Sequence, residues 1–170
     1  ASSGIGRYLA GTLVNSNDVW GIARNESELN VLQAQLGSRF SWSSCDVSSW
    51  SNLESVVGHI ETSWPSVDVL ICCAGVVAPI GPAMETAPES WSHAVRVNLD
   101  SVYFTIRSFF DLLMASQSRA KLICFSGGGA TGPRENFTPY AAAKAGVVRL
   151  VETLSEEWVG TSIDINAVAP

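Results

Sequence analysis

Residues 67–73 read VDVLICC and are followed directly by Ala74-Gly75. A short, nearly all-apolar run that stops at small residues is typical of a buried strand in a parallel sheet. Further short runs lie at 18–23, 39–44, 121–126 and 163–168, and amphipathic stretches at 26–36, 49–63, 89–117 and 139–159 separate them. Strands that alternate with helices predict βαβ units with right-handed crossovers. The expected fold is therefore α/β, a Rossmann-like doubly wound parallel sheet.

Composition limits the class of protein and of partner. The 170 residues are 46% hydrophobic and 15% charged, which predicts one globular domain over residues 1–170. A net charge of -6 argues against nucleic acid and anionic membranes as partners. The sequence contains no run of 18 apolar residues, so we expect no membrane-spanning helix. The cysteines at 45, 72, 73 and 124 fit no zinc pattern, so we expect no metal site. Reduced, buried thiols favour a cytoplasmic location.

A glycine turn opens the chain. Ala1-Ser2-Ser3-Gly4-Ile5-Gly6 precedes an amphipathic segment from Arg7 to Val14. Glycines let the main chain approach a pyrophosphate, and the helix start adds free N–H groups and the positive end of its dipole. A plain turn before a helix would show the same short motif, so the motif alone does not decide between the two.

Tyr140 and Lys144 lie four residues apart in a predicted helix and therefore share one face. An ammonium beside a phenol favours the phenolate form. Tyr140 could then exchange a proton with a substrate oxygen. An exposed Tyr and Lys at helical spacing would look the same, so the surrounding motifs have to decide.

Those motifs occur in one order along the whole chain: the glycine turn, Asp46-Val47 and Ala74-Gly75 each after a strand, Asn98, the Ser126 region, Tyr140-x-x-x-Lys144 and Asn166-x-Val-Ala-Pro. As a set they resemble the short-chain dehydrogenase/reductase family. The resemblance implies a nicotinamide-dependent oxidoreductase that interconverts a carbonyl and an alcohol by hydride transfer. Tyr140 would be the acid/base, and Lys144 would stabilise its phenolate and bind the nicotinamide ribose; both residues would also belong to the cofactor-binding set.

The resemblance also implies roles for other residues. Asn98 would hold a water that relays protons to Lys144, and Ser126 or a neighbour would orient the carbonyl. The remaining residues would bind the cofactor: Ser3, Gly4, Ile5 and Gly6 at the pyrophosphate, Asp46 and Val47 at the adenine, and Ala74 and Gly75 near the ribose.

The end of the run at 18–23 bears on cofactor choice. NAD enzymes usually place an acidic residue there, against the ribose 2′-hydroxyl. Here the stretch is Gly21-Ile22-Ala23-Arg24, without an acid. A guanidinium suits a 2′-phosphate, which favours NADP(H) over NAD(H). A solvated arginine at a helix entrance is the alternative.

Some positions depart from the family pattern. The family's serine stands thirteen residues before the tyrosine, where this chain has Gly127, one residue after Ser126. Either the glycine-rich loop shifts Ser126 into place or the site lacks the hydroxyl. Cys73 replaces an asparagine. The family's first strand and its C-terminal substrate region have no counterpart in this sequence, so we expect the chain alone to be poorly stable or inactive.

Two further expectations concern function and assembly. The alternative to an enzyme of small carbonyl or alcohol substrates is an NADP-binding relative without turnover, a redox sensor or scaffold; Gly127 favours it, and Tyr140, Lys144 and Asn98 argue against it. Apolar helix faces predict a homodimer or homotetramer, unless these faces pack on the sheet: Val102, Ile106, Phe109, Phe110, Leu113, Val147, Leu150, Val151 and Leu154.

Overall fold

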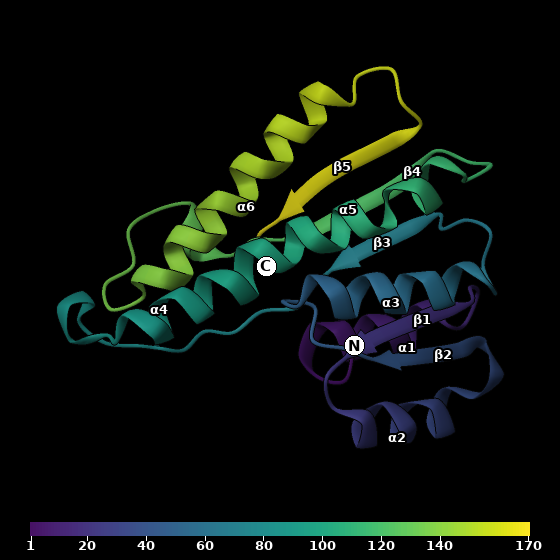
Figure 1. The fold of residues 1–170 in the computed structure, drawn as a ribbon, viewed down its shortest axis with the longest axis horizontal. Coiled ribbons are helices and arrows are strands. Elements are labelled where there is room, and N and C mark those ends of the chain that lie inside the picture. Colours follow the sequence, from purple (N-terminus) through teal and green to yellow (C-terminus); the bar gives the residue numbers. More distant parts are fainter.

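Strands and helices alternate along the whole chain in the computed structural model, which describes residues 1–170 (Figure 1). The strands are β1 (Val19–Ala23), β2 (Phe40–Ser44), β3 (Val69–Cys72), β4 (Ala120–Phe125) and β5 (Ile163–Val168). The helices are α1 (Gly4–Leu13), α2 (Glu26–Leu36), α3 (Trp50–Glu61), α4 (Pro88–Val95), α5 (Ser101–Met114) and α6 (Thr138–Glu157). Every strand and helix expected from the sequence is confirmed, with small shifts at the ends.

The strands are all parallel but form two separate sheets. One sheet pairs β1 with β2, and the other has the order β3-β4-β5. The α/β parallel fold class is thus confirmed. Residues of β1 and β3 line a cavity of about 950 Å³ between the two sheets. The Ala1 ammonium lies at one end of this space and donates a hydrogen bond of 2.9 Å to the Ile22 carbonyl oxygen of β1.

Local sequence explains where α2 begins and ends. The Asn25 side chain accepts a hydrogen bond of 3.2 Å from the Glu28 N–H, so it satisfies one of the free donors of the first turn. At the other end Gly37 has a φ of +76°, a left-handed conformation that glycine adopts without strain. The Asn25 cap fixes the turn from β1 into α2, and Arg24 lies in this turn.

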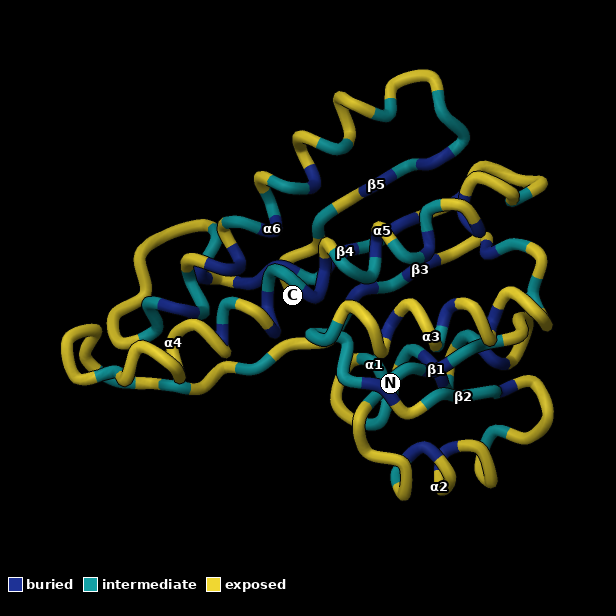
Figure 2. The backbone as a smooth tube through the Cα atoms, in the orientation of Figure 1, coloured by how far each residue is buried: buried dark blue, intermediate teal, exposed yellow.

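Each sheet has its own buried core (Figure 2). Helices α3, α5 and α6 cover one face of β3-β4-β5, and 19 buried residues fill that layer. Helices α1 and α2 pack against β1 and β2 around only five buried residues: Ala10, Val14, Leu29, Leu32 and Phe40. The fold therefore consists of a large and a small layered unit on either side of the cavity.

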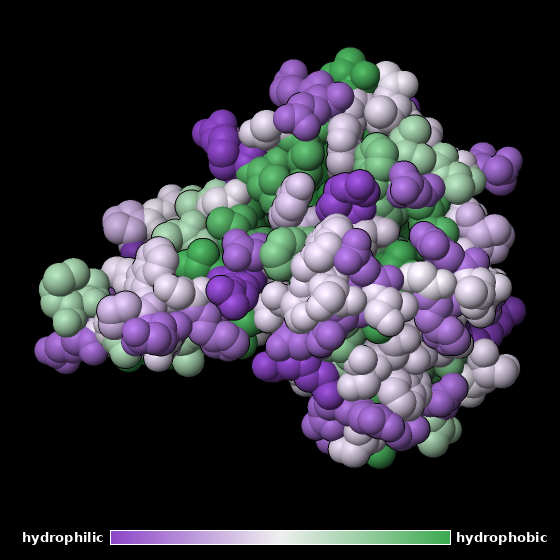
Figure 3. Space-filling view, viewed as in Figure 1, coloured by the Kyte–Doolittle hydropathy of each residue, from purple (hydrophilic) through white to green (hydrophobic).

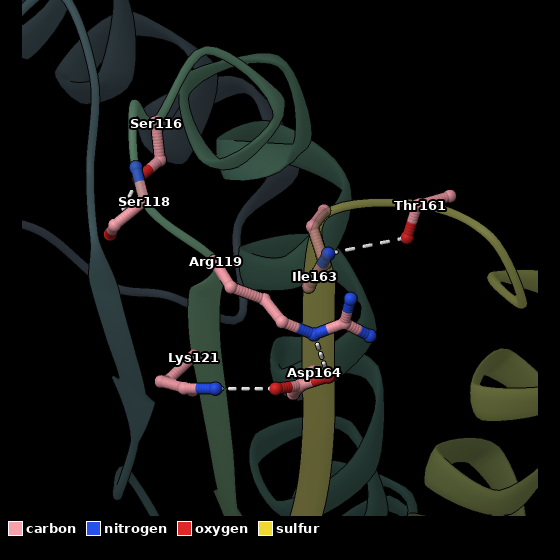
Figure 4. Close-up of polar contacts among 7 residues, drawn as sticks. All are labelled: Ser116, Ser118, Arg119, Lys121, Thr161, Ile163 and Asp164. Atoms are coloured by element: carbon pink, nitrogen blue, oxygen red, sulfur yellow. Dashed lines mark hydrogen bonds and ion pairs between the residues drawn. The ribbon is translucent and has the colours of Figure 1, made fainter.

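The second face of β3-β4-β5 is open. Side chains alternate along the strands, so Leu122 is buried under the helices whereas Val69 on the other face is 51% exposed. On this open face Arg119, just before β4, and Lys121 of β4 converge on Asp164 of β5, with 2.6 Å between the Arg119 Nε and Asp164 Oδ1 atoms (Figure 4). Hydrogen bonds from Lys121 and Arg119 lower the pKa of Asp164. Exposed ion pairs of this kind add little stability.

Most of the apolar stripe on α5 and α6 lies inside the chain's own core. Six of the nine residues named for it are buried: Val102, Ile106, Phe109, Leu113, Val147 and Val151. Packing on the sheet therefore accounts for them. Phe110, Leu150 and Leu154 stay partly exposed, where apolar side chains gather over α5 and α6 in Figure 3. A homodimer or homotetramer stays a prediction. None of the helices is long and apolar enough to cross a membrane.

Candidate active site

The glycine turn leads straight into α1. Ser3 is the extended N-cap residue, its side chain makes no capping bond, and Gly4 follows with a φ of +51°. A Cβ at Gly6 would lie 3.1 Å from the Cys73 Sγ atom and 3.3 Å from the Ala1 Cα atom, so only glycine fits without displacement. The first-turn N–H groups of α1 have no partner within the helix, which suits them to an anionic oxygen.

Asp46 lies just beyond β2 with one carboxylate oxygen already engaged. Its Oδ1 atom accepts hydrogen bonds from the Ser48 N–H at 3.0 Å and the Ser48 hydroxyl at 2.7 Å. Burial raises the pKa of Asp46, but these bonds and the charges of Arg24 and His93 outweigh burial and leave the pKa below its usual range. A carboxylate with a free second oxygen can accept from an amino group.

One cavity brings the predicted cofactor residues together. The space of about 950 Å³ is lined by all nine positions outside the Tyr-Lys pair: Ser3, Gly4, Ile5, Gly6, Arg24, Asp46, Val47, Ala74 and Gly75. They come from the carboxyl ends of β1, β2 and β3 and from the start of α1, the place where open parallel sheets bind ligands. At this end of the cavity, the glycine cradle and the exposed guanidinium fit a dinucleotide, whereas the rest of the cavity runs along β1 and β3 between the sheets.

Asn98 is wholly buried where the helix changes pitch. Residues Arg96–Asp100 form a π-helical turn between α4 and α5. The Asn98 side chain donates to the carbonyls of Val76 at 2.8 Å and Ala94 at 2.9 Å, and its Oδ1 atom accepts from the Val76 N–H at 3.1 Å. It thereby fixes the loop after β3. The sequence placed Asn98 in mid-helix, but no sequence pattern indicated the partner Val76, because main-chain groups are the same at every residue.

Lys144 and Tyr140 lie together on α6, beside this loop. The Lys144 side chain is buried, and its Nζ atom donates a 2.8 Å hydrogen bond to the Phe125 carbonyl oxygen and lies 5.9 Å from the centroid of the Tyr140 ring. A Cβ at Gly75 would meet the Asn98 Oδ1 atom at 2.8 Å and the Lys144 Nζ atom at 3.6 Å. Gly75 therefore lies between the cavity and the side chains of Asn98 and Lys144. Burial lowers the pKa of the Lys144 ammonium.

The Ser126 hydroxyl is bonded to the main chain of α6. The residue is buried, and its hydroxyl donates to the Lys144 carbonyl oxygen at 3.0 Å. A shift of Ser126 into the family's serine position would break this buried bond between the end of β4 and α6, so a role for Ser126 as the carbonyl donor stays a prediction. In the structure Ser126 contacts α6, and the place of the serine is held by Gly127.

The glycines after β4 have contacts that the sequence did not reveal. An ideal Cβ at Gly127 would lie 2.4 Å from the Tyr140 Oη atom, and one at Gly129 would lie 2.8 Å from the Ala141 Cα atom. These glycines let the loop lie directly on the start of α6. The repeated glycines at 127–129 were visible in the sequence, but which helix they would touch was not.

Comparison with known proteins identifies the family. A family model described as short chain dehydrogenase matches residues 1–170. This chain belongs to the short-chain dehydrogenase family. It is therefore an oxidoreductase of that family.

Named relatives are dehydrogenases and reductases. The chain is 31% identical to 2-dehydro-3-deoxy-D-gluconate 5-dehydrogenase of Pseudoalteromonas atlantica, a match that covers 98% of this chain and 67% of the relative. It is 29% identical to the 3-oxoacyl-[acyl-carrier-protein] reductase FabG of Escherichia coli, over 100% of this chain and 69% of the relative. A short chain dehydrogenase of Shigella flexneri complexed with NADP has the same fold, with a TM-score of 0.94 at 24% identity over 100% of this chain and 73% of that one.

Proposed function

We propose that this chain catalyses the NADP(H)-dependent interconversion of a small carbonyl compound and its alcohol. The observation that carries the proposal is that Gly75, at the edge of the cofactor cavity, lies against the buried side chains of Asn98 and Lys144, with Tyr140 on the same helix face as Lys144. Acid/base and cofactor-binding groups thus adjoin one another.

A reduced nicotinamide, when bound, supplies the hydride for the carbonyl carbon. The chain's own residues handle the proton and the geometry. The Tyr140 hydroxyl gives its proton to the carbonyl oxygen, and the Lys144 ammonium stabilises the phenolate that remains. The Phe125 carbonyl holds the Lys144 Nζ atom in place, and Asn98 holds the loop of Val76 against it.

NADP(H) is the proposed cofactor because of Arg24. Arg24 is exposed directly after β1, lines the cavity, and carries no ion pair within the chain. The Ser44 hydroxyl donates to the Arg24 carbonyl oxygen at 3.1 Å and fixes its main chain. A free guanidinium here can bind a 2′-phosphate with two hydrogen bonds. The NADP complex of the Shigella flexneri relative supports this choice.

A second function, cofactor binding without turnover, is favoured by Gly127, because the family's serine is absent and Ser126 is bonded to the main chain. The two functions differ in whether Tyr140 matters. A binding protein would keep its affinity for NADPH in a Tyr140→Phe variant and would show no carbonyl reduction in either form.

The experiment measures NADPH oxidation with a panel of aldehydes and ketones, using the full-length gene product. We expect Tyr140→Phe to lower kcat by about 10²–10⁴-fold, since general acid catalysis contributes that much. NADPH fluorescence titration should give an unchanged Kd. Tyr103→Phe is the matched control, because Tyr103 is 47% exposed on α5. Equal rates for wild type and Tyr140→Phe would refute the proposed function.

A further inference from the structure

Gly127 is a buried residue whose main-chain N–H lacks an acceptor within the chain. This N–H donates to no main-chain or side-chain oxygen, whereas the neighbouring Ser126 N–H donates to the Val168 carbonyl at 2.8 Å. Orphaned buried N–H groups are rare in folded proteins, and each calls for a partner. The position of this one, at the edge of the active site, indicates a ligand.

The direction of the N–H follows from the alternation along β4. The N–H groups of Ala120 and Ser126 donate toward the β5 side, to Ser162 and Val168, whereas the Lys121 N–H donates toward β3, to Asp68. Successive residues of an extended strand point to opposite sides. Gly127 is extended, with φ 172° and ψ 173°, so its N–H points to the β3 side, beyond the last pair of that ladder, Cys72 with Cys124.

The catalytic side chains lie on that same side. The Phe125 carbonyl, two residues earlier on the same edge, accepts the hydrogen bond from the Lys144 Nζ atom. Gly127 lies directly against the Tyr140 hydroxyl, since an ideal Cβ at Gly127 would overlap the Oη atom. One O–H donor and one N–H donor thus lie close together beyond the carboxyl ends of β3 and β4.

We propose that the Gly127 N–H is the second hydrogen-bond donor to the substrate oxygen, in the place of the serine hydroxyl that this chain lacks. The inference rests on the proposed function and adds the group that polarises the carbonyl. In reduction, the hydride of the reduced nicotinamide adds to the carbonyl carbon, the carbon–oxygen double bond becomes single, and Tyr140 protonates the oxygen. The Gly127 N–H donates to that oxygen while negative charge develops on it, as oxyanion-hole amides do.

The direct test replaces Gly127 by glycolic acid, which changes the amide into an ester and deletes only the N–H. We expect kcat for carbonyl reduction to fall by about 10²–10³-fold, the loss usual for one oxyanion donor. The Kd for NADPH, measured by fluorescence, should not change, and this also shows that the variant is folded. The same ester at Gly132, an exposed glycine with nothing within 4 Å of an added Cβ, is the matched control. An unchanged kcat in the Gly127 ester would overturn the proposal.

Ordinary substitutions provide a second test. Restoring the family's serine by Gly127→Ser should not raise activity, because the added Cβ displaces the Tyr140 hydroxyl and the amide already donates. We expect Gly127→Ser and Gly127→Ala to lose kcat by a similar factor. A Gly127→Ser variant more active than wild type would contradict the proposal and show that the site had simply lacked a donor.

The outcomes separate this proposal from the function on which it rests. Turnover that Tyr140→Phe abolishes and the Gly127 ester leaves intact would refute the role of Gly127 and keep the oxidoreductase. Absence of wild-type turnover on the whole carbonyl panel, with NADPH still bound, would refute the proposed function and the role of Gly127 together.

Discussion

The two layered units of this chain differ in size and in the work they do. The unit of β1, β2, α1 and α2 has five buried core residues, whereas the unit of β3, β4, β5, α3, α5 and α6 has 19. The small unit carries Arg24, Asp46 and the glycine turn of α1, which face the cofactor cavity. The large unit carries Asn98, Tyr140 and Lys144 and holds their geometry by buried hydrogen bonds.

Under the proposed function, this difference divides cofactor binding from proton transfer between the two units. Proton transfer requires fixed distances, and a dense core supplies them because packed side chains cannot shift freely. The proposed cofactor binding at the small unit would rely on main-chain N–H groups and exposed charges, which tolerate more movement. With unpaired edges on β1 and β3 facing the cavity, we expect the small unit to open more easily than the large one in the 170-residue chain.

The largest expected effect tests this difference in stability. Leu29 and Leu122 are both fully buried, one in each core. Leu122→Ala should lower the global free energy of unfolding by about 2–5 kcal/mol, through lost burial and a cavity. Leu29→Ala should speed hydrogen exchange in β1, β2 and α2 and leave the protection of β4 amides unchanged. Equal loss of protection in β1 and β4 after Leu29→Ala would mean that the chain unfolds as one unit.

A smaller effect tests the role of the small unit in cofactor choice. Arg24→Ala should lower the preference for NADPH over NADH by about tenfold or more, since a charged hydrogen bond to the 2′-phosphate is worth about 1.5–3 kcal/mol. The kcat at saturating cofactor should stay within a factor of about two, since no proton transfer involves Arg24. Arg39→Ala is the control, because Arg39 is exposed and lies outside the cavity lining. An unchanged NADPH preference would make Arg24 a solvated surface arginine.

The smallest expected effect concerns Lys144 and pH. Burial lowers the pKa of Lys144 below its usual 10.5, so in the window between the two values the unfolded state binds more protons than the folded one. Stability contributed by this residue therefore rises with pH in that window. Lys144→Met should remove this rise of stability with pH. It should also stabilise the fold at neutral pH, because no charged group then has to be buried. Lys121→Met, at an exposed position, is the control.

Urea denaturation between pH 7 and pH 10.5 measures the free energy of unfolding of wild type and of Lys144→Met. The value for the variant is then subtracted from the value for wild type at each pH. Subtraction is needed because burial also raises the pKa of the Cys45 thiol, which has the opposite dependence on pH. A difference between wild type and Lys144→Met that does not change with pH would contradict a lowered pKa at Lys144.

The elements of this fold were predictable because periodicity is a local property. The run at 67–73 and the stretch at 26–36 correspond to β3 and α2 within a few residues. A buried strand leaves a continuous apolar run in the sequence, and a helix with one buried face leaves apolar residues every three or four positions. The break within 89–117 was not located in advance. Residues Arg96–Asp100 form the π-helical turn around the buried Asn98, and that turn depends on the contact of Asn98 with the distant Val76.

The sequence by itself determined the family, the order of the motifs and the pairing of Tyr140 with Lys144 on one helix face. These follow from residue type and spacing alone. Only the tertiary structure decided that Ser126 bonds to the Lys144 carbonyl, that Gly127 lies under the Tyr140 hydroxyl, and that the apolar faces of α5 and α6 mostly pack inward. The contacts of Ser126 and Gly127 depend on how closely the end of β4 approaches α6, and the inward faces depend on how both helices pack on the sheet. Tertiary packing sets these distances, and no local pattern of residues encodes them.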